Sequence, residues 1–218
     1  MRTSIVRIAV VVALLAGYAR AQESSGAWVS TGSYKPRQTL FTVNWEIAGP
    51  IGSFSDYIND TSLRGFSLEW RSMLQEKFSL GVSFSWNRFN QTFDQLTVQL
   101  PNNVTATGPV FKYADFFGVR AIAHYYLGSL DRPLQPYLGV GIGGTWAYSY
   151  QQIADLSQSQ SNFDFIVDPE VGLFFWFAKG ASTAGLNLAF RYTYTTATAG
   201  RQHDLQWLSG LVGVVFGY

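Results

Sequence analysis

The 218-residue chain is 47% hydrophobic and 17% aromatic, and only 13% of its residues are charged. This length fits one domain or at most two, and so much apolar side chain requires a large apolar surface to be covered. The net charge of +1 gives no reason to expect a nucleic-acid partner. The lack of cysteine excludes a disulfide framework and a thiolate metal site.

The first residues have the three parts of a secretory signal peptide. Arg2 and Arg7 supply the positive charge, a short apolar run follows, and Ala19-Arg20-Ala21 forms a small-x-small cleavage site. The apolar run is about ten residues long, too short to cross a bilayer as a helix. We therefore predict a signal peptide at 1–21, a flexible Ser/Gly-rich segment at 22–38, and one main domain at 39–218.

The main domain repeats a two-residue rhythm, with an apolar or aromatic residue at every second position. Because successive side chains of a β-strand point to opposite faces, such a segment has one apolar and one polar face. The rhythm recurs in eight segments, at 41–47, 64–72, 78–87, 115–127, 137–146, 164–177, 186–195 and 212–218. Pro169 cannot donate to a sheet ladder, so we expect a bulge or local break there.

The links between these segments alternate in length. Those after the second, fourth and sixth segments are short, whereas 49–62, 90–114 and 151–162 are long and polar. Outer-membrane barrels have short periplasmic turns and long extracellular loops. After the signal peptide no apolar run is long enough for a membrane helix, so insertion would use strands. The pattern predicts an all-β fold, a transmembrane eight-stranded up-and-down antiparallel β-barrel in the bacterial outer membrane, with both termini periplasmic.

Aromatic residues are sorted toward the two ends of the predicted strands. Trp45, Trp86, Trp146 and Tyr194 fall near the loop end, and Trp70 falls near the turn end. Rings with one polar and one apolar side favour membrane interfaces, so these residues predict two girdles in contact with outer-membrane lipid. A soluble sandwich or a lipocalin-like barrel, the alternative fold, gives no reason for this sorting.

The polar faces carry charged residues that would point into the barrel. An eight-stranded barrel is only wide enough inside for its own side chains, so buried charges must pair. We predict a lumen closed by a charge network; the alternative is a narrow polar path gated by one of the pairs. The network comprises Glu46, Glu69, Arg71, Arg120, His124, Asp168, Glu170 and Arg191.

No pattern of catalytic or cofactor-binding residues stands out. Metal-ligand spacing, a phosphate loop and a nucleotide fingerprint are all missing from the sequence, so we predict no metal and no cofactor. His124 falls mid-strand on the crowded inward face, where a structural role is favoured. His203-Asp204 falls at the loop end, where some barrel enzymes act on lipid, but nothing marks a serine nucleophile beside it. We therefore predict no catalytic residues.

Short stretches resemble a known superfamily. Gly213, Phe216 and Tyr218 resemble the terminal-strand signal that the barrel-assembly machinery reads, and 136–144 and 185–194 resemble strands of small OmpA-like and OmpW-like barrels. The resemblance implies an eight-stranded barrel inserted from the periplasm, with the assembly machinery as a partner. It does not imply one activity, because this architecture hosts several.

These observations favour a non-enzymatic outer-membrane barrel whose loops, especially 90–114, recognise an extracellular ligand or have a structural role. One alternative is an OmpW-like conduit for small hydrophobic solutes, with an apolar pocket that Phe93, Leu96 and Val98 could line. A second is a barrel enzyme that modifies lipid A, using His203.

Overall fold

The computed structural model describes five stretches of the chain, all within one compact unit, Lys35–Tyr218. The described residues are 39–99, 105–127, 133–153, 156–177 and 183–218. The predicted signal peptide at 1–21 and the flexible segment at 22–38 lie outside them.

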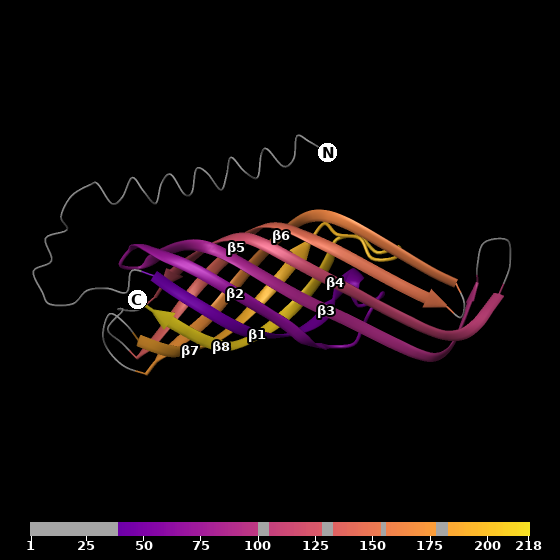
Figure 1. Ribbon diagram of the computed structural model, residues 1–218, viewed down its shortest axis with the longest axis horizontal. Helices are drawn as coiled ribbons and strands as arrows, with labels where there is room; N and C mark the ends of the chain where they lie inside the picture. The colour runs from indigo at the N-terminus through magenta and orange to yellow at the C-terminus, as the bar shows by residue number, and fades with distance from the viewer. Residues whose placement is uncertain (1–38, 100–104, 128–132, 154–155, 178–182) are drawn as a thin grey trace, which may run out of the picture. The chain divides into compact units, whose positions relative to one another are not determined.

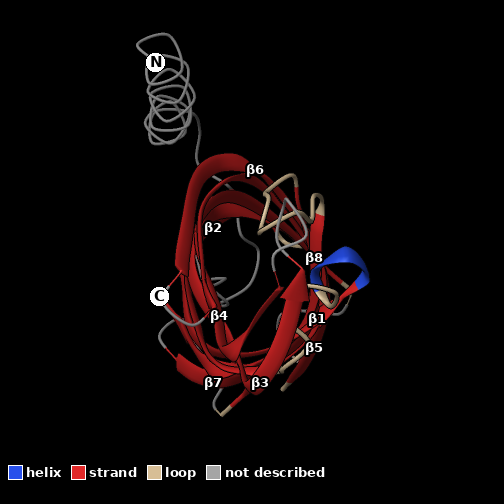
Figure 2. Ribbon diagram, turned by 90° about the vertical axis from the view of Figure 1, so that its right-hand side faces the viewer, coloured by secondary structure: helices blue, strands red, loops and turns tan. Residues whose placement is uncertain are grey.

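Eight antiparallel strands form a ring in the described residues, each paired with its neighbours in the chain, and the last closes on the first (Figures 1 and 2). They are β1 (Thr39–Ile51), β2 (Ser62–Gln75), β3 (Phe78–Gln99), β4 (Thr105–Tyr126), β5 (Leu134–Ile153), β6 (Leu156–Trp176), β7 (Thr183–Thr195) and β8 (Leu205–Gly217). The predicted eight-stranded up-and-down barrel is confirmed. No helix among the described residues is long and apolar enough to cross a membrane.

Buried and exposed residues alternate along the strands. Many of the buried side chains are polar or charged and the exposed ones are apolar, the reverse of a soluble protein. In β2, Glu69 and Arg71 are almost fully buried, whereas Trp70 between them is 54% exposed. In β8, Ser209 and Leu211 point inward and Val212 points outward. The barrel therefore presents apolar side chains to its surroundings and buries charged ones such as Glu46, Arg120 and Arg191 inside.

Pro169 interrupts pairing without a bulge. Its ladder with β5 keeps one register throughout, and Val140 is its partner. On the other side, pairing with β7 stops after Val167↔Tyr194 and resumes in the same register at Glu170↔Arg191. Because proline has no N–H to donate, the ladder opens for two residues and continues unshifted.

The strands differ in length, which corrects part of the sequence reading. Strands β3 to β6 have 20 to 22 residues and the other four have 13 or 14. Most of 90–114 and 151–162, predicted as loops, is thus strand. Figure 1 shows the two long hairpins running past the ends of the other strands. We call this four-stranded extension the projecting sheet: residues 88–99 of β3, 105–115 of β4, 147–153 of β5 and 156–164 of β6.

Candidate functional site: the lumen and its two ends

The barrel interior has three layers, and the middle one is charged. It contains every lumen residue that the sequence predicted, and none is more than 7% exposed. The eight form one large group around Arg191 and one separate pair, Arg120 with Asp168.

Arg191 is the centre of the larger group. Its Nη2 lies 2.6 Å from both Glu69 Oε1 and Glu170 Oε2, and its Nε donates to Glu170 at 2.7 Å. Its Nη1 lies 3.7 Å from Glu46 Oε2. One guanidinium from β7 therefore faces carboxylates from β1, β2 and β6, and the fork of N–H groups that arginine offers suits this role.

Arg71 and His124 adjoin this centre. Arg71 donates from Nη2 to Thr42 Oγ1 at 2.6 Å, and its Nη1 contacts Nδ1 of His124. Because a guanidinium can only donate, Nδ1 of His124 acts as the acceptor. The imidazole is also stacked on the ring of Tyr137, at 4.7 Å between centroids. His124 is thus held as a packed hydrogen-bonding group.

Arg120 and Asp168 form the separate ion pair, and Arg120 also donates to Ser85 Oγ at 2.8 Å. Glycines of β5 leave room for the long side chains. A Cβ added at Gly139 would lie 2.9 Å from His124 Nε2, and one at Gly141 would lie 3.2 Å from Cδ of Arg120. A water-sized void lies between Arg120, His124 and Arg191.

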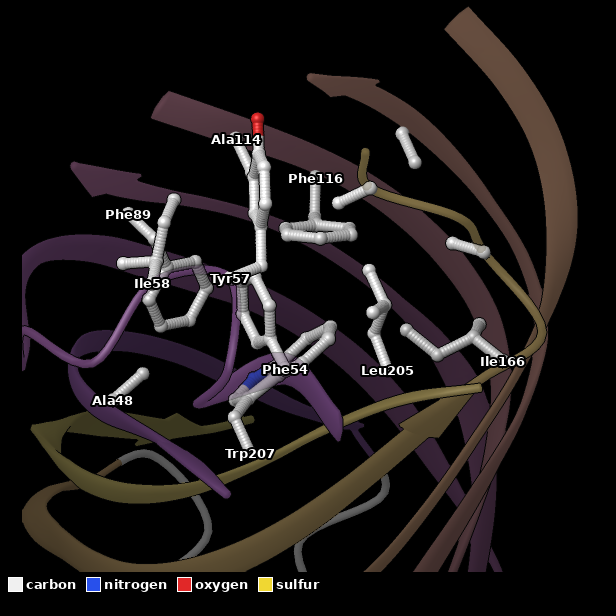
Figure 3. Packing of buried hydrophobic residues seen from close by; sticks show 13 residues of the cluster. Ala48, Phe54, Tyr57, Ile58, Phe89, Ala114, Phe116, Ile166, Leu205 and Trp207 are labelled. Carbon is white, nitrogen blue, oxygen red and sulfur yellow. The ribbon is translucent and has the colours of Figure 1, made fainter. Parts of the chain in front are cut away.

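An apolar plug fills the loop end of the lumen, and the sequence reading missed it. The link 49–62, predicted as a polar loop, turns inward through a 3-10 helix, Gly52–Phe54. Phe54 and Ile58 are fully buried, and the ring of Phe54 lies 4.8 Å from Phe89 and 6.0 Å from Trp207 (Figure 3). Apolar residues at 54, 57 and 58 within a polar link were the available signal.

Tyr57 fastens the plug to the projecting sheet. Its hydroxyl donates to the carbonyl oxygen of Tyr150 at 3.2 Å, and Lys112 Nζ donates to the carbonyl oxygen of Tyr57 at 3.2 Å. The same ammonium lies 5.1 Å from the centre of the Tyr57 ring. Burial of the phenol raises the pKa of Tyr57 to about 12.

An aromatic layer closes the turn end. Tyr137 is stacked on Phe174 at 4.7 Å, and Tyr126 and Trp176 pack around them. The hydroxyl of Tyr137 donates to Glu170 Oε1 at 2.7 Å, so this layer also completes the charged one. Within the described residues, the lumen is therefore apolar, charged and apolar in succession.

The sequence profile of a family described as "Outer membrane protein beta-barrel domain" matches residues 8–211. The chain belongs to this family. No curated protein sequence matches it. Neisserial surface protein A has a similar structure, with a TM-score of 0.53 and 13% identity over 83% of this chain and 97% of that one.

Two further barrels match with lower scores. OprG of Pseudomonas aeruginosa has a TM-score of 0.48 and 12% identity, over 85% of this chain and 98% of that one. Ail, the attachment invasion locus protein of Yersinia pestis, has a TM-score of 0.46 and 12% identity, over 85% of this chain and all of that one. At these identities the likeness extends to the fold alone.

In an outer-membrane barrel the exposed apolar band faces lipid, and the structure places the aromatic residues of the loop end in one row. Phe66 pairs with both Trp45 and Trp86, and Phe117 pairs with Trp86 and Trp146. Trp45 and Trp146 donate from Nε1 to polar acceptors, the carbonyl oxygen of Leu63 and Ser161 Oγ. Further aromatic positions are Tyr194, whose hydroxyl donates to Asp204, and Trp70, nearer the turn end.

The two alternative sites gain no geometric support. His203 Nδ1 lies 3.1 Å from the Thr198 hydroxyl, and the nearby Ser53 donates to backbone carbonyls of residues 203 and 204. No serine is hydrogen-bonded to the His203 ring in the described part of the chain. Of the expected pocket residues, Phe93 packs near Lys112, and the side chains of Leu96 and Val98 lie outside the described residues.

Proposed function

We propose that this outer-membrane barrel has a closed lumen and acts, without catalysis, as a structural or recognition protein that presents the projecting sheet outside the cell. The observation that carries the proposal is the filling of the lumen by three layers, with Arg191 bound to carboxylates of three other strands. A conduit would need a continuous path, and the plug, the ion pairs and the stacked rings each occupy it.

The connections support one orientation of the barrel in the membrane. Strands β2 and β3 are joined by Glu76 and Lys77 alone, at the end where β1 begins and β8 ends. Short turns belong to the periplasmic side of such barrels. We therefore place both termini in the periplasm and the projecting sheet in the extracellular space. The predicted signal peptide and the predicted assembly signal of Gly213, Phe216 and Tyr218 fit this route of insertion.

Conductance of the purified protein in planar lipid bilayers tests the closed lumen. We expect no stable channel current from the native protein. Arg191→Ala should give intermittent current because three carboxylates lose their shared counter-ion, whereas Arg88→Ala, outside the lumen, should not. Steady current from the native protein, or uptake of small hydrophobic solutes by proteoliposomes, would overturn the proposal.

Lipid analysis tests the absence of catalysis. We expect the lipid A of cells that overproduce the protein to be unchanged. The hydroxyl at the His203 ring is that of Thr198, and no carboxylate among the described residues is hydrogen-bonded to this ring to orient it as a base. Altered lipid A that returns to normal in His203→Ala would contradict this expectation.

A further inference from the structure

One edge of the projecting sheet is an open, regular β-strand. Pairing of β6 with β7 ends at Ile166↔Thr195, so residues 156–164 of β6 have a strand neighbour only on the β5 side. On that side the ladder keeps one register up to Ile153↔Leu156. The other side has no backbone partner among the described residues.

The direction of the free hydrogen-bonding groups follows from Phe165. Its N–H donates to Thr196 Oγ1 and its carbonyl accepts from the Thr196 N–H at 3.1 Å, both on the β7 side. In an antiparallel strand every second residue directs both groups to the same side. The N–H and carbonyl groups directed to the open side therefore belong to the exposed residues Ser157, Ser159, Ser161 and Phe163.

This edge lacks the features that protect sheet edges. Residues 156–163 contain no charge and no proline. Of the four residues that direct their backbone groups to the open side, three are serines. The opposite edge, in β3, carries Arg88 and Asp94, and its ladder shifts register between Phe93 and Leu96. Natural proteins block unwanted pairing with charges and bulges. The β3 edge is protected in this way, and the β6 edge is not.

We infer that the β6 edge pairs with the β6 edge of a second copy of this chain in a facing membrane. The inference rests on the proposed extracellular position and recognition role of the projecting sheet. Two copies in one membrane have β6 running in the same direction, so their edges could meet only in parallel. Copies in facing membranes run in opposite directions and meet antiparallel, the more stable arrangement per residue.

The segment is complementary to itself about a two-fold axis at Gln160. Ser159 of each copy then faces Ser161 of the other, and Ser157 faces Phe163. Each such pair exchanges two N–H···O bonds, as in any antiparallel ladder. Asp164 falls opposite Leu156, so no like charges meet. The interface is isologous and therefore closes at two copies.

Vesicle clustering tests the pairing with the full-length native barrel as the only protein. Phosphatidylcholine vesicles carrying it should grow in mean diameter by light scattering. Ser159→Pro removes an N–H that is directed to the open edge, and it leaves the ladder with β5 intact. The rate of clustering should therefore fall by about tenfold or more. Thr92→Pro, the same change on the β3 edge, is the matched control and should cluster like the native protein.

A second variant tests the edge without the risk that Ser159→Pro fails to fold. Ser159→Lys combined with Ser161→Lys adds charge to the edge without restricting the backbone and should also abolish clustering. Heat-modifiable migration in SDS gels verifies that each variant is folded. Native vesicles that stay separate, or clustering that survives both edge variants, would overturn the pairing. Bilayer recordings on the same preparations test the closed lumen independently.

Cross-linking tests the register, because the native chain has no cysteine. Gln160→Cys places one thiol in each copy at the two-fold axis, in a non-hydrogen-bonded pair with Cα atoms about 4.5 Å apart, within disulfide range. Air oxidation of clustered vesicles should give a disulfide-linked dimer, with oxygen accepting the electrons and protons of the two thiols. Asn162→Cys, which faces residue 158, should stay monomeric. The reverse result would overturn this register.

Discussion

The membrane-embedded ring and the projecting sheet are continuous strands that meet different surroundings. In the ring every strand has two neighbours, its outer side chains are apolar, and its charges are buried in the lumen. In the projecting sheet the outer strands have one neighbour each, and charge reaches the surface at Arg88, which is 41% exposed and pairs with the buried Asp115. In the ring, pairing of every strand on both sides satisfies the backbone hydrogen bonds, as lipid requires. In the projecting sheet, β3 and β6 each keep one edge with free hydrogen-bonding groups.

The largest expected difference between the two regions concerns their ion pairs. Arg191→Ala should lower the free energy of unfolding by about 3–5 kcal/mol, because it leaves buried carboxylates without a counter-ion. Arg88→Ala breaks a bidentate pair whose arginine side chain is 41% exposed and whose Asp115 side chain is 6% exposed. It should cost less, about 1–2 kcal/mol, because water can reach the freed carboxylate through the space that the arginine leaves. Urea unfolding in detergent measures both, and equal losses would contradict the contrast.

A charge on the outer face locates the boundary between the regions. Val82 and Thr92 both lie on the outward face of β3, and Val82 is 45% exposed. Val82→Arg should cost about 2–4 kcal/mol because the charge would sit in lipid. Thr92→Arg should change stability by less than about 0.5 kcal/mol. Reversible unfolding in lipid vesicles measures the difference, and similar costs would place the boundary elsewhere.

Packing inside and outside the ring can be compared with two glycines. A Cβ at Gly139 would lie 2.9 Å from His124 Nε2, whereas one at Gly210 meets nothing within 4 Å. Gly139→Ala should therefore cost about 1–3 kcal/mol by overpacking the lumen. Gly210→Ala should be close to neutral. Denaturant titration of the pair decides this, and a neutral Gly139→Ala would indicate a loosely packed lumen.

The smallest effect concerns the plug that joins ring and sheet. The pKa of Tyr57 is raised to about 12 by burial, from an ordinary value of 10.0. The folded state therefore favours the neutral phenol, and its stabilising contribution is present below pH 10 and is lost as the pH rises toward 12. Phenolate absorbance, compared between the native protein and Tyr57→Phe, should show one tyrosine ionising late. An ordinary titration would mean that Tyr57 is solvated.

The sequence was informative wherever one face of a strand meets lipid. Alternation in the eight segments, most clearly at 78–87 and 186–195, predicts strands and the direction of their side chains, and across all eight it places every residue of the lumen network inside. At residues 156–159 of β6 the side chains on both faces are exposed, so the alternation fades although the ladder continues. For this reason the sequence predicts loops at 90–99 and 156–162, where the structure has strands.

The contacts inside the lumen could not be predicted in the same detail. Alternation places Arg191 and Glu69 inside, but which strands face each other across the ring depends on its stagger. The plug was missed for a related reason, because Phe54 and Ile58 belong to a link with no period of its own. The break in pairing at Pro169 could be predicted from the sequence. The unchanged register on either side of it could not, because it follows from the intact ladder with β5.

The long reach of the lumen contacts bears on how the barrel assembles. Arg191 meets Glu69 across 122 residues of chain, and Ser209 donates to Glu46 across 163. Strands β2 and β7 are not neighbours in the ring, so the first contact cannot form in an open sheet. Until β1 meets β8, these charges need water as their partner. Closure of the ring is therefore also the step at which the charged side chains exchange water for one another and water leaves the lumen.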